Sequence, residues 1–477
     1  MLNHKIMPDP ATSARVLGTT SLEDEVSLHE IPVRGEMPEW LDGALLRNGP
    51  ARFEAGEKSV NHWFDGLAML HRFGIREGRV SYSNRFLRTK AFEASNEGRI
   101  GYREFASDPC RTMFNRIASL FVESEMSDNA FISIAEIDER FVAMSETPLG
   151  VVFDPDTLET LGHDRHPPGH LPTAHPQFDP VTGEMINFAV HLGPVSSYRL
   201  YIRNGADRTI GSLRDMQPAY LHSFGLTERF VILVLGPLRV QPMSLAMSSK
   251  PFIENYRWNS GKDTEFVAFD RRTGKVAQRW SGEPIFLFHH INAFEEGDDL
   301  VVDLCAYRDA RLIDDLYLGK LRAGGGVDQP RPRRYRLPLG GGEAGYEVLA
   351  DAELELPRIN DRFNTKPYGV AWGISRTQDE AFGDALARLD VKERSVCQWS
   401  EPGCHPGEPI FVSRPGAIAE DDGILLSVVL DAAAGRSFLL VLDAAEMEEL
   451  ARAEVPHHIP FGIHGHFRQG SGQFPRN

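Results

Sequence analysis

The sequence predicts an all-β protein and, among all-β architectures, a β-propeller. Most segments are short runs of continuous or alternating apolar residues that end in Gly, Asp, Asn or Pro, which is typical of strands joined by turns. The clearest runs are residues 131–134, 230–235, 300–304 and 424–430. Helical patterns are few. These observations favour an all-β fold with only short helices.

A weak repeat supports the propeller. An apolar strand that ends in Asp is followed by a turn and another strand at Asp154, Asp270, Asp390 and Asp443. Hairpins repeated over so much of the chain suit four-stranded units stacked around an axis better than one sandwich. The residues alone leave the number of blades open, and also leave open an array of several β domains.

The chain has 477 residues, so it forms either several domains or one large modular architecture. We expect an N-terminal extension at residues 1–36 and a single β-propeller catalytic domain at residues 37–477. A stretch rich in Pro and Arg lies between two glycine clusters at 324–326 and 340–342, and we interpret the clusters as surface loops around a strand.

Charge and cysteine content limit the possible partners and the cellular setting of the protein. The formal net charge is −17, which argues against a nucleic-acid partner because such a partner requires a basic face. Four cysteines without a CxxC pair indicate a reducing, cytoplasmic setting; they are Cys110, Cys305, Cys397 and Cys404. No signal-like segment or apolar run long enough to span a membrane is found, so we expect at most peripheral contact with one.

Four of the 17 histidines lie beside apolar strand starts or glycines, where an unpaired imidazole would be costly to bury. They are His175, His222, His289 and His464. Convergence on one metal would explain their burial, since neutral imidazole is a common ligand. They are far apart in the sequence and form no local motif, so histidines that merely bond within the core remain an alternative.

Several longer segments resemble the carotenoid cleavage oxygenase family. Residues 63–71 (WFDGLAMLH), preceded by residues 47–50 (RNGP), are similar to its N-terminal signature. Residues 288–295 (FHHINAFE), 355–360 (ELPRIN) and 460–465 (PFGIHG) resemble three further blocks, in the same order. The matches cover nearly the whole chain.

This resemblance implies a seven-bladed β-propeller, with short helices and loops capping the face that bears the metal. It also implies Fe(2+) on the propeller axis, bound by His175, His222, His289 and His464, with O2 as co-substrate. The neighbouring His290 is not expected to be a ligand. Four neutral ligands would leave the iron its full charge and leave coordination positions open for O2 or substrate.

Three glutamates match family residues that hold the ligand histidines. By resemblance Glu146 would pair with His222, Glu355 with His289 and Glu408 with His464, whereas His175 would have no carboxylate partner. Each carboxylate would accept the second ring N–H of its histidine and fix the tautomer. From the residues alone, a surface salt bridge remains the alternative for each glutamate.

The resemblance implies a dioxygenase that cleaves a conjugated C=C bond of a carotenoid or apocarotenoid to carbonyl products, with the apolar polyene held in a tunnel. Residues 107–114, 127–130 and 145–148 are similar to the branch of the animal carotene oxygenases and the retinal pigment epithelium isomerase. Stilbene-cleaving relatives carry Lys where this chain has Ser145. Stilbene cleavage, a non-oxidative isomerase and a polyene-binding protein remain alternatives.

A mixed apolar and basic segment at residues 237–258 resembles the part of the family at which the tunnel mouth meets a membrane. Such contact would place the protein at the inner face of the membrane, through mainly apolar docking. The alternative is an amphipathic helix packed on the propeller. The residues expected at the tunnel mouth are Leu238, Val240, Met243, Leu245, Met247 and Phe252.

Overall fold

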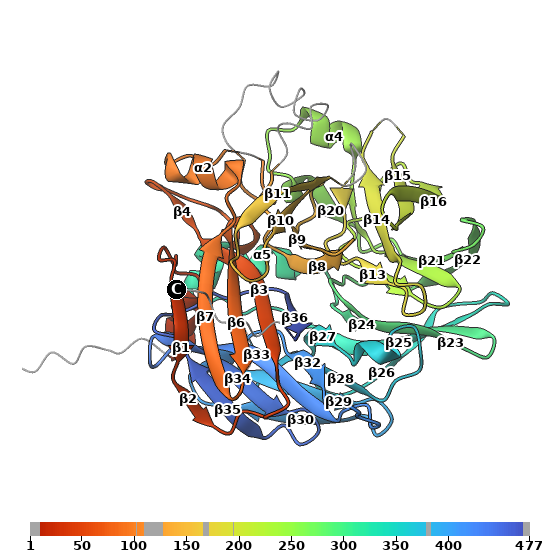
Figure 1. The fold of residues 1–477 in the computed structure, drawn as a ribbon. Helices are drawn as coiled ribbons and strands as arrows, with labels where there is room; N and C mark the ends of the chain where they lie inside the picture. Colours follow the sequence, from red (N-terminus) through yellow and green to blue (C-terminus); the bar gives the residue numbers. More distant parts are fainter. Residues whose placement is uncertain are drawn as a thin grey trace, which may run out of the picture.

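The computed structural model describes residues 10–101, 103–108, 127–165, 171–193, 195–377 and 383–470. Within these ranges the chain forms seven antiparallel sheets of four to six strands, arranged as the blades of a seven-bladed β-propeller (Figure 1). This confirms the all-β prediction and the blade number that the resemblance implied. We number the blades 1 to 7 from the one that contains β3.

The first four blades contain the following strands. Blade 1 consists of β1 (Ser27–Ile31), β7 (Arg79–Phe86), β6 (Leu67–Arg76), β3 (Gly43–Arg52) and β36 (Gly465–Gln469). Blade 2 consists of β8 (Ser133–Ile137), β9 (Arg140–Met144), β10 (Leu149–Phe153) and β11 (Thr160–Arg165). Blade 3 consists of β12 (Leu171–Pro172), β13 (Gln177–Phe178), β14 (Met185–His191), β15 (Ser197–Arg203) and β16 (Asp207–Arg214). Blade 4 consists of β17 (Gly225–Leu226), β18 (Phe230–Leu235), β21 (Thr264–Asp270) and β22 (Val276–Gly282).

The other three blades follow the same plan. Blade 5 consists of β23 (His290–Glu296), β24 (Asp299–Ala306), β25 (Arg331–Pro338) and β26 (Gly345–Val348). Blade 6 consists of β27 (Glu355–Arg358), β28 (Val370–Ser375), β29 (Ala385–Asp390) and β30 (Ser395–Ser400). Blade 7 consists of β31 (Cys404–Pro406), β32 (Ile410–Ser413), β33 (Gly423–Asp431), β34 (Arg436–Asp443), β35 (Glu449–Glu454) and β2 (Val33–Gly35).

The repeated aspartates are turn residues. Asp154 Oδ1 accepts the backbone N–H groups of Asp156 and Thr157 at 2.9 and 2.8 Å, which closes the turn between β10 and β11. Asp270, Asp390 and Asp443 make the same pair of bonds in blades 4, 6 and 7. Asp179 in blade 3 does so too, although the sequence repeat did not identify it. The repeat therefore marks equivalent hairpins.

Both ends of the chain close the ring. The N-terminal strand β2 pairs with β35 of the last blade, with Val33 opposite Ala453, and the C-terminal strand β36 pairs with β3 of the first blade, with Leu45 opposite Phe467. β1 also pairs with β7 in blade 1. The boundary expected at residue 36 is therefore placed too late, because the strands at residues 27–35 are integral parts of two blades.

The core consists of apolar wedges between neighbouring blades. β18 shows how a continuous apolar run serves a propeller: Val231 and Leu233 pack toward blade 3, whereas Ile232 and Val234 pack toward blade 5. All four are buried because the sheet is covered on both faces. The predicted strands at 230–235, 300–304 and 424–430 lie within β18, β24 and β33, and the run at 131–134 overlaps β8.

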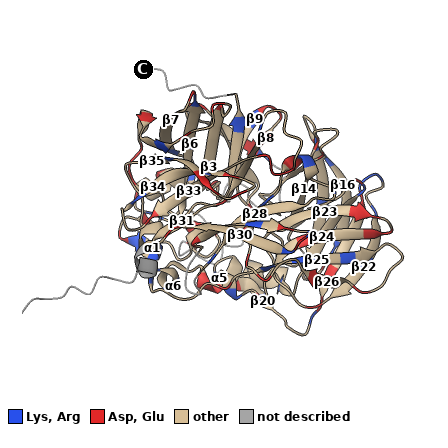
Figure 2. Cartoon of the chain, turned by 90° about the horizontal axis from the view of Figure 1, so that it is seen from below, with Lys and Arg blue, Asp and Glu red and all other residues tan. Residues whose placement is uncertain are grey.

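Short helices and two extra hairpins cover one end of the propeller, and α1, α5, α6 and β20 of this cap lie along the lower edge of the view in Figure 2. The described helices are α1 (Pro10–Gly18), α2 (Lys90–Asn96), α4 (Pro242–Met247), α5 (Arg311–Asp315) and α6 (Leu318–Arg322), with 3-10 turns η1 (Trp63–Asp65), η3 (Ile253–Asn255) and η4 (Asp361–Phe363). The extra hairpins are β4 (Glu54–Ala55) with β5 (Lys58–Ser59), and β19 (Leu238–Val240) with β20 (Tyr256–Trp258). Phe64, Leu245, Leu312 and Leu318 from this cap share one buried cluster with blades 1 to 3.

Acidic and basic residues are interspersed over the strands and turns of the blades in Figure 2. Among the described cysteines, Cys305 and Cys404 are buried and Cys397 is exposed, and all three are free thiols. Cys110 and residues 109–114 of the segment similar to the animal branch lie outside the described residues.

Candidate metal centre

The predicted site residues come from all seven blades. His175 lies between β12 and β13, and His222, His289 and His464 lie just before the inner strands β17, β23 and β36. These histidines belong to blades 3, 4, 5 and 1. The three glutamates belong to the remaining blades: Glu146 follows β9, Glu355 begins β27 and Glu408 lies between β31 and β32. Each blade thus directs one residue to the axis, which unites residues that are far apart in the sequence.

The four histidines meet at one point. One ring nitrogen from each of His175, His222, His289 and His464 lies within 4.8 Å of the others. The Nε2 atoms of His175 and His222 are 2.9 Å apart, and those of His289 and His464 are 3.2 Å apart. Adjacent ligands at right angles around a metal have this separation when the metal–nitrogen bonds are about 2.1 Å long. The geometry fits a metal held by four imidazoles.

Three of the histidines also contact a carboxylate, in the expected pairs. Nδ1–H of His222 donates to Glu146 at 2.6 Å and that of His289 donates to Glu355 at 2.6 Å. His464 donates in the same way to Glu408 at 2.7 Å.

The hydrogen bonds determine where the lone pairs point. A neutral imidazole carries its proton on one nitrogen and a lone pair on the other. Because Nδ1–H of His222, His289 and His464 is bonded to a carboxylate, Nε2 of each directs a lone pair at the shared centre. Lone pairs so close to each other repel unless a cation lies between them. The donor set therefore fits a bound metal ion.

Burial keeps two of the imidazoles uncharged. Burial, together with the neighbouring histidines, lowers the pKa of His175 well below its ordinary value. Burial also lowers the pKa of His464 to about 4, although Glu408 acts in the opposite direction. Both side chains are therefore neutral at pH 7 and can act as ligands without losing a proton.

His175 is positioned by a hydroxyl group instead of a carboxylate. Thr173 Oγ1 accepts the backbone N–H of His175 at 3.1 Å and donates to the carbonyl oxygen of His222. The Nε2 atom of His175 lies 2.9 Å from that of His222, and no described carboxylate contacts the His175 ring. Thr173 thus connects two of the candidate ligands, and nothing in the sequence identified it.

Glu408 lies in a buried ion-pair network that sequence reasoning missed. Arg47 Nη1 donates to its carboxylate at 3.0 Å and Arg358 Nε at 2.8 Å. Burial alone would raise the pKa of Glu408, but Arg358, His464 and Arg47 hold it well below its ordinary value. Both arginines lie in segments that carry the family resemblance, RNGP and ELPRIN, so the signal was present without an assigned role.

The other two carboxylates are held by tyrosines. Tyr220 Oη donates to Glu146 at 3.0 Å and Tyr307 Oη donates to Glu355 at 2.9 Å. Burial would raise the pKa of Glu355, but His289 and the hydrogen bonds from Leu356 N–H and Tyr307 keep it below its ordinary value. With three carboxylates and two guanidinium groups, the cluster carries one net negative charge, which favours a divalent cation.

His290 does not join the cluster. Its Nδ1 lies 2.8 Å from Ser223 Oγ, and it is absent from the group of candidate ligand atoms. That His289 and not His290 is a ligand stays a prediction.

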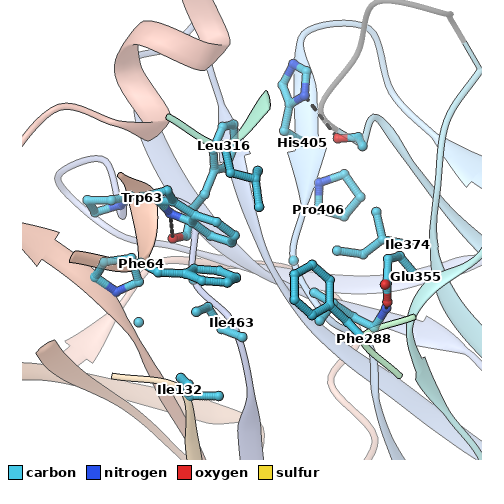
Figure 3. Close-up of a pocket in the computed structure, with 18 of the residues that line it drawn as sticks. Trp63, Phe64, Ile132, Phe288, Leu316, Glu355, Ile374, His405, Pro406 and Ile463 are labelled. Carbon is cyan, nitrogen blue, oxygen red and sulfur yellow. Dashed lines mark hydrogen bonds between the residues drawn. The ribbon is translucent and has the colours of Figure 1, made fainter. Parts of the chain in front are cut away.

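An apolar cavity adjoins the histidines. His222 and His289 lie in its wall together with aromatic and aliphatic side chains from the cap and the blades, among them Trp63, Phe64, Ile132, Phe288, Leu316 and Ile374 (Figure 3). The rings of Phe64 and Phe288 face each other edge to face at 5.9 Å. The sequence predicted an apolar tunnel without assigning its residues.

The predicted tunnel-mouth residues divide into two groups. Leu238, Val240 and Leu245 are buried in the cap cluster, and Phe252 packs partly against it. Met243 and Met247, on α4, are 63% and 66% exposed. The segment thus forms a short helix packed on the molecule, with two methionines available on its surface. Within the described ranges no helix is long and apolar enough to cross a membrane.

The chain is similar over most of its length to known proteins of one family. A sequence model of the family described as retinal pigment epithelial membrane protein matches residues 19–469. The carotenoid isomerooxygenase of Galleria mellonella is 35% identical, with 94% of this chain and 95% of that protein aligned. The beta,beta-carotene 15,15'-dioxygenase of Gallus gallus is 32% identical over 91% of this chain and 94% of its own length. The cobalt-substituted apocarotenoid oxygenase of Synechocystis superposes with a TM-score of 0.86 at 25% identity and covers 97% of this chain and 99% of its own.

Proposed function

Because the chain belongs to the retinal pigment epithelial membrane protein family, to which carotenoid oxygenases belong, we propose that it is an iron(II) dioxygenase acting on carotenoids or apocarotenoids. It would cleave one conjugated C=C bond and release two carbonyl products. The observation that carries the proposal is the convergence of four imidazoles, three of them paired with carboxylates, on the wall of an apolar cavity.

The residues of the chain would hold iron and position the substrate. His175, His222, His289 and His464 would bind iron(II), a metal that imidazole ligands suit. The chemistry that iron(II) supplies when bound is the activation of O2, so that each carbon of the double bond gains one oxygen atom. One alkene and one O2 thus give two carbonyl groups, and the reaction requires no further reductant.

The cavity wall would bind and orient the substrate. Phe64 and Phe288 present apolar surfaces beside the histidines, which suits a flat polyene and excludes water. Holding one double bond beside the metal makes the reaction of substrate and O2 effectively intramolecular. The carboxylates would keep each imidazole in the tautomer that binds metal. No side chain needs to act as a nucleophile or general base.

The direct test is aerobic incubation of the iron(II)-loaded protein with carotenoids, apocarotenals and hydroxystilbenes, with products identified by mass. Aldehydes from a polyene would support the proposal, and cleavage of stilbenes alone would contradict the substrate class. Iron binding without oxygen consumption would contradict the oxygenase. Because one relative is named an isomerooxygenase, the double-bond geometry of each product should also be determined by chromatography.

The ligand assignment is tested by a matched pair of variants. His464→Ala should abolish iron retention and turnover while leaving the propeller folded, because it removes one of the converging nitrogens. His290→Ala changes the histidine beside His289 and should retain iron, since His290 bonds to Ser223 instead. Metal analysis after gel filtration measures the iron content of both variants. Full iron content in His464→Ala would refute the assignment.

We further propose that the surface of α4 contacts membranes through Met243 and Met247. Their exposed side chains would enter an interface without requiring a basic patch, which suits a chain of net charge −17. The double variant Met243→Ser/Met247→Ser should sediment less with phosphatidylcholine vesicles than the native protein. Val181→Ser, at an exposed apolar residue in another part of the propeller, is the control. Equal sedimentation of all three proteins would contradict the proposal. The cytoplasmic location stays a prediction.

A further inference from the structure

His405 is a polar residue in the wall of the apolar cavity that no step of the proposed reaction uses. It lies on β31, is buried, and lines the cavity together with Pro406, Leu316 and Ile374. A polar side chain in such a place either bonds to another protein group or is free to bond to a ligand inside the cavity.

Its hydrogen bonds determine what kind of partner fits. Nδ1 lies 3.1 Å from the carbonyl oxygen of Gly383. A carbonyl only accepts, so Nδ1 carries the proton and Nε2 of the neutral ring is an acceptor. Among the described residues none bonds to Nε2. The buried polar atoms that lack a partner and are fully enclosed by protein do not include Nε2, so this nitrogen is accessible to a ligand. The site therefore presents a free acceptor.

His405 and Ile132, a residue bonded to the candidate metal centre, lie on opposite sides of the aromatic side chains of the cavity. Ile132 marks the metal end, because its carbonyl oxygen accepts the backbone N–H of His464 at 3.2 Å. In Figure 3 Ile132 lies at the bottom of the view and His405 at the top, with Trp63, Phe64 and Phe288 between them. An elongated molecule with its reacting bond at the metal would therefore extend one end toward His405.

A second polar side chain lines the same cavity. Gln329 is partly buried and its amide has no side-chain partner among the described residues. An amide both donates and accepts, as a hydroxyl group does. Most other polar groups in the wall are already paired: Glu355 with His289, and Tyr307 with Glu355. His405 Nε2 and the Gln329 amide are thus unpaired polar groups in the wall, as is Asn48 Oδ1, which is fully enclosed by protein.

We propose that His405 recognises a hydroxyl group at the end of the polyene, so that the enzyme prefers hydroxylated carotenoids or apocarotenoids to their unhydroxylated counterparts. This inference rests on the proposed function for the identity of the ligand as a polyene. The hydroxyl donates to Nε2, which an aldehyde, a ketone or a hydrocarbon ring cannot do. His405 is thus a specificity-determining residue, with Gln329 as a second contact for the same hydroxyl.

The test compares pairs of substrates that differ only in ring hydroxyl groups: β-carotene with zeaxanthin, which has one hydroxyl on each ring, and an apocarotenal with its 3-hydroxy derivative. The native enzyme should favour the hydroxylated member by about 10-fold in kcat/KM, because the unhydroxylated member leaves a buried acceptor unpaired. In His405→Leu the ratio should fall to about one. In His405→Gln, which keeps an acceptor, an intermediate ratio is expected.

The control is His458→Leu, the same chemical change at a histidine whose ring bonds to the backbone oxygen of Thr20 and which does not line the cavity. It should keep the native ratio. The dissociation constants of the same pairs are measured without O2, by quenching of protein fluorescence, so that failure of turnover does not hide the result. A native preference that His405→Leu abolishes, without any turnover, would support the hydroxyl site and contradict the dioxygenase. Turnover with the same substrate ratio in both proteins would overturn the hydroxyl site alone.

Discussion

The Glu408–His464 and Glu146–His222 pairs share one geometry but lie in different surroundings. In both, a carboxylate accepts Nδ1–H within 2.7 Å. Glu408 is 1% exposed and bonds to two arginines, whereas the Glu146 side chain is 18% exposed and bonds to the hydroxyl of Tyr220. The same positioning of an imidazole is thus achieved by charge compensation in one pair and by a neutral hydrogen bond in the other. Removing the carboxylate should therefore have different consequences in each.

The largest effect is expected for Glu408→Gln. The amide keeps the shape but removes the counter-charge of Arg47, which is buried, and of Arg358, whose side chain is 34% exposed. Breaking a buried ion pair from one side costs about 3–5 kcal/mol of unfolding free energy, and metal affinity should fall as well. Urea denaturation and metal analysis measure the two effects. A loss of stability below about 1 kcal/mol would contradict the role of the network.

A pH titration tests the buried histidine of the same pair. The pKa of His464 is about 4 in the folded protein and 6.5 when unperturbed, so between these values the unfolded chain binds more protons. The unfolding free energy of the metal-free protein should therefore fall as the pH is lowered from 6.5 to 4, by about 3 kcal/mol for this residue alone. Glu355, whose pKa is lowered, adds stability above pH 4.5 that is lost only on further acidification.

Urea denaturation at pH 7, 6 and 5 measures this slope. Other buried histidines with lowered pKa, such as His62 and His71, contribute in the same direction. His464→Asn is therefore compared with the native protein, and it should show a shallower dependence. Identical slopes would mean that His464 is protonated equally in the folded and unfolded states.

A smaller effect on stability is expected for Glu146→Gln. Glu146 is partly exposed and no described arginine or lysine bonds to it, so no buried charge loses its partner. Metal affinity should still fall by about 10–100-fold, because the imidazole of His222 loses the carboxylate that orients it. Titration with a metal buffer measures the affinity, and unfolding free energy should change by about 1 kcal/mol or less. Destabilisation equal to that of Glu408→Gln would erase the contrast between the two pairs.

The smallest effect on metal affinity is expected for Tyr220→Phe. It removes one hydrogen bond to Glu146 and keeps the ring, which should cost about 1 kcal/mol and lower metal affinity by roughly fivefold. Tyr307→Phe, which removes the equivalent bond to Glu355, is the matched variant and should behave alike. If either variant loses as much metal affinity as removal of the carboxylate that the tyrosine bonds to, the tyrosine does more than position that carboxylate.

The strands and turns of this molecule were largely predictable from local sequence, because the interactions that form them join residues close together in the chain. The turn aspartates Asp154, Asp270, Asp390 and Asp443 bond to backbone groups two and three residues away, so the pattern is visible without a structure. The apolar run at 230–235 likewise follows from a strand covered on both faces. The candidate ligands and their carboxylates came from resemblance of segments, since their spacing alone left a core of bonded histidines open.

The sequence by itself determined the all-β class, the repeated hairpins and, through resemblance, the seven residues that converge on the axis. Only the tertiary structure decided how these residues are held: the arginines on Glu408, the tyrosines on Glu146 and Glu355, and Thr173 between two histidines. It also placed His405 on the wall of the cavity and β2 in the last blade. The physical reason is that each of these contacts joins different blades or the two ends of the chain. Such partners are chosen by ring closure and packing, which no local pattern of residues encodes.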